Sequence, residues 1–191
     1  MNWPRLALVP AFTLLVLGAA CTDDEGEGSS EDLTVEAYFD EIEAIFQESS
    51  NSTDQLGDDL EENVSSAETF EEQVSALREF LSGAADVFDS AVTEMESIQP
   101  PVEVEQPHND FVEGATEVAS TTTALEEELA DAEDEAEASE LLEEFEAESA
   151  DPLFTIDEAC ADLQDIAEDN GIEADLRCTE RVFPERPQEP F

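Results

Sequence analysis

The sequence predicts an all-α protein, built as an antiparallel bundle of four main helices. Two observations carry this prediction. Apolar residues recur at alternating steps of four and three in three long segments, and a proline pair and capping motifs separate those segments. The length of 191 residues favours one folded domain. Hydrophobic residues make up 40% of the chain, which is enough to build a core despite the extreme acidity.

The three stripes run from Val35 to Leu60, from Phe70 to Ile98 and from Phe111 to Ala136. An average spacing of 3.5 residues places each set along one side of a helix, and acidic residues fill most other positions. The weakest stretch is 49–57, where serine and threonine occupy stripe positions, so we expect a kink or local opening there. A long coiled-coil oligomer is the alternative to a self-contained bundle.

Local signals mark the expected helix ends. Thr69 and Glu72 have the spacing of a capping box, Pro100-Pro101 stops the second helix, and Pro107 stands where the third would begin. The register slips after Ala136, which predicts a stutter or a short break.

The last ordered element is expected from Ile156 to Asn170. Thr155 and Glu158 have capping-box spacing at its start, and Asn170-Gly171 supplies a left-handed stop at its end.

Residues 1–21 have the composition of a secretory signal: one arginine, an apolar run from Leu6 to Leu17, and small residues before Cys21. The cysteine after small residues resembles the lipobox of bacterial lipoproteins, a family in which that cysteine is acylated and begins the mature chain. Gly18 departs from the pattern, because leucine is preferred three residues before the cysteine. The alternative is an ordinary signal cleaved near Ala20, which would leave Cys21 free.

Lipidation of Cys21 would leave Cys160 and Cys178 as an even pair outside the membrane, where disulfides persist. A disulfide between them would close a loop of about 19 residues, and the loop-entropy model assigns it ~3 kcal/mol.

The expected organisation is a signal peptide (1–20), a lipid-attachment cysteine with an acidic tether (21–31), the bundle (32–180) and a proline-rich tail (181–191). The chain would be exported and held at the outer face of the cell membrane. The layout of a long acidic helix, a Pro-Pro pair, a helix opening with histidine and a C-terminal cysteine pair resembles uncharacterised helical lipoproteins of high-GC Gram-positive bacteria. This resemblance covers roughly residues 35–178 and implies no activity.

The charge excludes several classes of partner. There are 54 acidic residues and five arginines, a formal net charge of −49, so a basic nucleic-acid surface and a polybasic lipid patch are both excluded. The carboxylate coat is interpreted as adaptation to a salty medium. Weak binding of divalent cations is the alternative, although the ordered ligand spacing of an EF-hand loop is absent.

His108 is the one histidine. A transition-metal site with Glu105, Asp110 and Glu113 is conceivable, although one histidine with carboxylates is a weak ligand set and a capping or packing role is favoured. A single histidine also excludes a di-iron bundle site. No nucleophile, phosphate-loop or metalloprotease motif is present.

The sequence therefore predicts a lipid-anchored, extracytoplasmic binding or envelope-associated protein without enzymatic activity or a required cofactor, with a possible protein partner at the cell surface. The first alternative is a divalent-cation or metal binder that uses carboxylates and His108. A hydrolase with acidic catalytic residues is the second.

Overall fold

The structure is a computed structural model, and it describes residues 33–177. These residues form four helices: α1 (Val35–Ser66), α2 (Phe70–Ser97), α3 (Glu105–Leu129) and α4 (Glu135–Asp169). The chain divides into two units at Glu31, and all four helices belong to the second, Asp32–Phe191. The signal, Cys21, the tether, Cys178 and the proline-rich tail lie outside the described residues.

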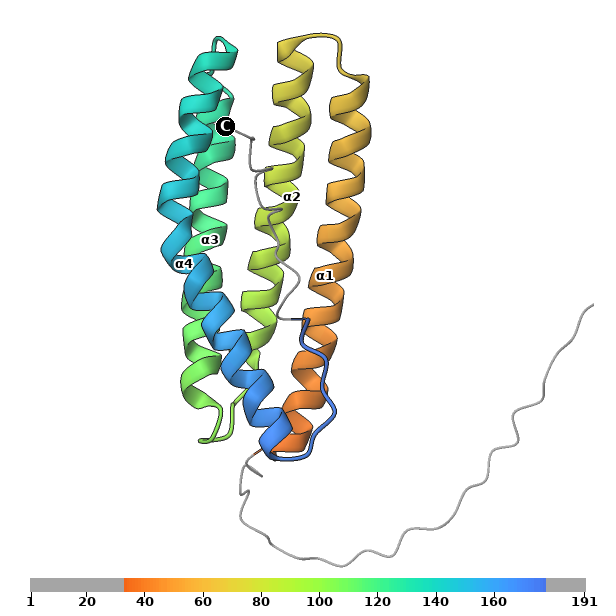
Figure 1. The fold of residues 1–191 in the computed structure, drawn as a ribbon, viewed down its shortest axis with the longest axis vertical. Coiled ribbons are helices and arrows are strands. Elements are labelled where there is room, and N and C mark those ends of the chain that lie inside the picture. Colours follow the sequence, from red (N-terminus) through yellow and green to blue (C-terminus); the bar gives the residue numbers. More distant parts are fainter. Residues whose placement is uncertain (1–32, 178–191) are drawn as a thin grey trace, which may run out of the picture. The chain divides into compact units, whose positions relative to one another are not determined.

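Short connections make successive helices antiparallel neighbours, as Figure 1 shows. The main helix contacts are α1 with α2, α2 with α3, and α3 with α4. The pair α1 and α4, which would close the ring, is not among them. The prediction of an antiparallel four-helix bundle is confirmed, but one side of that bundle is less completely closed than the others.

The expected start and stop signals around α2 are confirmed. Thr69 and Glu72 form a complete capping box, and α2 ends at Ser97, three residues before Pro100. Gly171, after the end of α4, has a φ of 71°, the left-handed conformation that favours glycine.

The third and fourth helices differ from their predicted bounds. The break lies at 130–134, before Ala136, and Asp134 caps α4 by accepting hydrogen bonds from the backbone N–H groups of Ala136 and Glu137. The predicted stripe runs past this break because Ala132 and Ala136 fit the apolar spacing whether or not the backbone between them is helical. Glu133 precedes α4, and its backbone N–H donates a hydrogen bond to the carboxylate of Glu137.

The prediction of a separate last helix that begins at Ile156 is also wrong. α4 runs without interruption from 135 to 169 and contains Pro152. Thr155 is no cap, because its hydroxyl donates to the carbonyl of Asp151 inside the helix. A proline within a helix removes one hydrogen bond and crowds the preceding turn, which bends the helix without ending it when the two halves are packed. Figure 1 shows that bend in α4.

Two clusters of buried side chains hold the helices together. The large core, at the end of the bundle that contains the start of α1, draws on all four helices and on Leu176. The small core, at the opposite end, consists of Leu81, Leu125, Leu129 and Ala138, with partly buried side chains around it. None of the small-core residues comes from α1.

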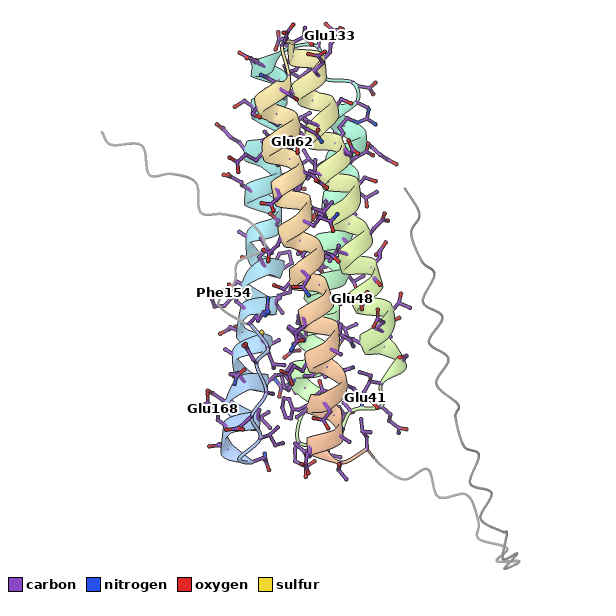
Figure 2. The ribbon with its side chains drawn as sticks, turned by 90° about the vertical axis from the view of Figure 1, so that its right-hand side faces the viewer. Glu41, Glu48, Glu62, Glu133, Phe154 and Glu168 are labelled. Carbon is purple, nitrogen blue, oxygen red and sulfur yellow. The ribbon has the colours of Figure 1, made fainter. Side chains whose placement is uncertain are left out.

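The charge of the bundle lies on its surface. Residues 33–177 carry 45 of the 54 acidic residues, with Arg78 and Arg177 as the arginines of that range. Arg78 links α2 to α3, since its guanidinium donates to the carboxylate of Glu126 at 2.6 Å and to the backbone carbonyl of the same residue. Glutamates project outward along the bundle in Figure 2, including Glu48, Glu62 and Glu168.

Candidate functional site: an apolar cleft between α1 and α4

A cleft of about 460 Å³ opens between α1 and α4, with α2 and α3 beneath it. From α1 the lining residues are Ile45, Phe46, Ser49, Ser50, Thr53 and Asp54, and from α4 they are Ala150, Leu153, Phe154, Ile156, Asp157 and Cys160. Val87, Phe88, Ala91 and Phe111 come from α2 and α3, and Leu176 and Arg177 close one side. The volume falls within the range of about 300 to 1,000 Å³ that is usual for ligand sites.

The backbone of α4 bends beside the cleft because of Pro152. Gly114 on α3 lets the bent segment of α4 pack close to α3. A Cβ added at Gly114 would lie 2.9 Å from the carbonyl oxygen of Pro152 and 2.9 Å from Ile156. The absence of a side chain at Gly114 therefore sets how closely α4 packs on α3. This contact fixes the α4 wall of the cleft.

The walls are rich in aromatic surface. The rings of Phe46 and Phe111 pack with centroids 4.9 Å apart, and Phe88 is buried beside them. Phe154 differs, because 60% of its surface is exposed although it lines the cleft. Figure 2 shows it on α4, about halfway along the bundle. Exposed apolar surface that is continuous, as this ring is with the apolar cleft that it lines, is a common sign of a binding site.

Polar groups from α1, α4 and the segment after α4 also line the cleft. The guanidinium of Arg177 donates to the hydroxyl of Ser50 at 3.1 Å, and Asp54 and Asp157 lie on the lining. Arg177 has a φ of 51°, which is unusual for a residue with a side chain, and its backbone N–H donates to Asp175. The chain is thus turned at Arg177 so that its side chain reaches α1.

The segment after α4 is held by Gln164. Its amide nitrogen donates to the carbonyl of Ala174, and its amide oxygen accepts from the N–H of Leu176 at 3.4 Å. Leu176 is buried, and its carbonyl oxygen lies 3.9 Å from the sulfur of buried Cys160. Cys178 is two residues further on, outside the described residues, so the Cys160–Cys178 pairing stays a prediction.

The predicted metal residues occupy a different place, at the start of α3. His108 is buried, and its Nδ1 lies 3.1 Å from the hydroxyl of Tyr38. Glu105 and Glu113 are exposed, and Asp110 is half-buried. Within residues 33–177, no group of three or more His, Cys, Asp or Glu side chains is placed to hold a metal ion.

Burial explains the electrostatics of the Tyr38–His108 pair. Desolvation lowers the pKa of His108, because the protonated ring would lose its hydration, and it raises the pKa of the Tyr38 hydroxyl for the corresponding reason. The pair is a neutral hydrogen-bonded contact within the large core. This agrees with the packing role favoured for His108.

The cleft was not recognised from the sequence, although one signal pointed to it. The weak stretch at 49–57 includes Ser49 and Thr53, which line the cleft. The expected local opening is absent, since α1 is helical throughout that stretch. Small polar residues at stripe positions left space next to α4 without breaking the helix.

Comparisons with protein-family models, with curated proteins and with solved structures found no match for this chain. Among the described residues, no helix has the length and apolar character required for a membrane span.

Proposed function

We propose that this chain is a lipid-anchored, extracytoplasmic binding protein, and that its ligand occupies the cleft between α1 and α4. Cys21 would carry the lipid, the acidic tether would hold the bundle away from the membrane, and a Cys160–Cys178 disulfide would secure the segment that contributes Leu176 and Arg177. We propose binding without catalysis, because the one histidine of the chain is hydrogen-bonded to Tyr38 of the large core and does not line the cleft.

The observation that carries this proposal is the exposure of Phe154 at the edge of an apolar cleft of ligand size. Exposing an aromatic ring to water costs free energy that burial beneath a ligand would recover, at about 25 cal/mol per Å² of apolar surface. Val102, which is exposed in the loop between α2 and α3, does not line this cleft.

The charge of the bundle restricts the chemistry of the ligand. With 45 carboxylates against two arginines in residues 33–177, the surface potential is negative and repels anions. An apolar ligand that is neutral or positively charged would meet the least electrostatic resistance. Fatty acids and other anionic amphiphiles are disfavoured on this argument.

The binding test uses the exported chain with Cys21→Ser, which needs no detergent because it carries no lipid. The neutral dye Nile red is titrated against the parent, Phe154→Ser and Val102→Ser. We expect a loss of affinity of about tenfold for Phe154→Ser, since a phenylalanine contact is commonly worth 1–2 kcal/mol. Val102→Ser, the matched control, should bind as the parent does. Equal affinity for all three proteins would contradict the proposed site.

The anchor is tested by metabolic labelling with an alkynyl palmitate. The parent should incorporate the label and sediment with membranes, and Cys21→Ser should do neither. Labelling that persists in Cys21→Ser would place the lipid on another residue and would overturn this part of the proposal.

A further inference from the structure

The described structure ends in the cleft, since Leu176 and Arg177, the last two residues described, both line it. The chain continues with Cys178 and then through Arg181-Val182-Phe183-Pro184. Any segment that follows Arg177 therefore begins beside the apolar walls. The residues that follow Arg177 are therefore candidates to occupy the cleft.

The length of this segment is sufficient. Phe183 is six residues beyond Arg177, a span of up to about 20 Å when extended. The α1 side of the cleft, from Ile45 to Asp54, is about 14 Å long at the helical rise. Pro184 also favours an extended backbone at Phe183. All of the cleft is within reach of that ring.

The charge of the segment is complementary to the bundle. Three of the five arginines of the chain lie between 177 and 186, and residues 181–187 carry two arginines and one glutamate. They would approach a surface that is otherwise acidic, including Asp54 and Asp157 on the lining. Val182 and Phe183 add apolar side chains next to these charges, so the segment matches the cleft in charge and in apolar character.

We infer that residues 181–187 dock in the cleft between α1 and α4 of their own chain, with Val182 and Phe183 on its apolar wall and Arg181 and Arg186 toward its carboxylates. This inference rests on the proposed function, since the same cleft is the ligand site, and it makes the segment an internal competitor of the ligand. Tethering gives the segment an effective concentration in the millimolar range. A segment with an intrinsic dissociation constant near 0.1 mM would therefore occupy the cleft about nine-tenths of the time.

Competition between the segment and a ligand is measured with Nile red on the full-length chain that carries Cys21→Ser. We expect the double substitution Val182→Ser/Phe183→Ser to increase dye affinity about tenfold, because only the uncovered fraction of the parent can bind. Arg181→Glu/Arg186→Glu should increase it by a smaller factor. Gln188→Ser, a polar change directly after this segment, should leave it unchanged.

Docking is measured directly by placing the photo-cross-linker benzoylphenylalanine at Phe183 and identifying the attached peptides by mass spectrometry. Cross-links within one chain to 45–54 of α1 or 150–157 of α4 would support the inference. Cross-links only to other helix faces would overturn it. Cross-links between two chains, seen as a dimer band, would also overturn it and would make a second copy the occupant.

The two measurements separate the inference from the proposed function. If the parent and the double variant bind the dye equally, and Phe154→Ser weakens both, the cleft binds ligands but the segment does not cover it. If no protein binds the dye in the cleft while Phe183 cross-links to its walls, the segment is a permanent cover and the proposed binding function fails.

Discussion

The large core and the small core of this bundle differ in the number of helices that build them. At the large core all four helices contribute, and the segment after α4 adds Leu176. At the small core α1 contributes none of the residues, and its second half has no buried residue after Ile45. The cleft lies at the transition between these two regions. The second half of α1, which adds no side chain to the small core, can therefore leave an apolar site open at mid-length without a break in the helix.

Matched leucine truncations should give the largest contrast. Leu163 in the large core and Leu129 in the small core are both fully buried. We expect Leu163→Ala to cost about 4 kcal/mol of unfolding free energy and Leu129→Ala about 2–3 kcal/mol, because the less enclosed site can relax into the cavity. Urea denaturation measures both without adding salt. A larger cost for Leu129→Ala would contradict the difference between the cores.

A second pair of variants compares Gly114 and Gly83, the two glycines that lie close to a neighbouring helix. Gly114→Ala should destabilise the protein by about 2 kcal/mol, since its Cβ would press on the backbone carbonyl of Pro152. At Gly83 the added Cβ meets only the flexible end of Leu56, and alanine is the better helix former, so Gly83→Ala should change stability by less than about 1 kcal/mol. Thermal melts of both variants test this. Similar losses would show that α1 is packed as tightly as α4.

Sodium chloride should stabilise the end of the bundle near the small core more than the other end. Residues 126–151 contain 14 carboxylates, and each like-charged i, i+4 pair on a helix costs a few tenths of a kcal/mol. Raising NaCl from about 0.1 M to 1 M shortens the Debye length from about 10 to 3 Å. Hydrogen exchange should then slow most in the first half of α4, by roughly 1 kcal/mol of opening free energy. A uniform effect along α4 would contradict this expectation.

Thr122→Val should stabilise the protein by about 1 kcal/mol, because a buried hydroxyl without a partner carries a desolvation cost that valine removes. Thr122 is fully buried in α3, and its hydroxyl has no hydrogen-bond partner among the described residues. Thr123→Val is the matched control, since the Thr123 hydroxyl donates to the carbonyl of Ala119. Chemical denaturation in urea compares them. Destabilisation by Thr122→Val would indicate a partner for that hydroxyl.

The smallest effect concerns pH and the large core. Burial holds the pKa of His108 below its ordinary value of 6.5, so the unfolded chain binds this proton more readily than the folded chain does. Neutral His108 makes its full contribution to stability above pH 6.5. That contribution is lost as the pH falls from 6.5 toward the lower pKa of the folded state. The difference in stability between the parent and His108→Gln isolates this group from the carboxylates. If that difference does not change between about pH 8 and pH 5, the histidine is not buried in its neutral form.

Much of this fold could be predicted from local chemistry. The apolar spacing from Phe70 to Ile98, the Thr69–Glu72 capping box and the Pro100-Pro101 pair specify α2 closely, because each acts over a few residues. The weak stretch at 49–57 was a poorer guide, since α1 stays helical through it. Tertiary packing alone decided that α4 continues through Pro152, since Gly114 admits the bend and the two halves pack on α3.

The cleft is likewise a product of tertiary structure. It depends on which faces of α1 and α4 fail to meet, and no local pattern encodes that relation between residues about 100 positions apart. Most of its apolar lining could not be told apart from core by spacing, because Phe46, Phe88 and Phe111 follow the same apolar stripes as the buried residues around them. The sequence by itself determined the helices and the acidic surface, through propensities and charges that act locally. Packing determined where the apolar surface remained open.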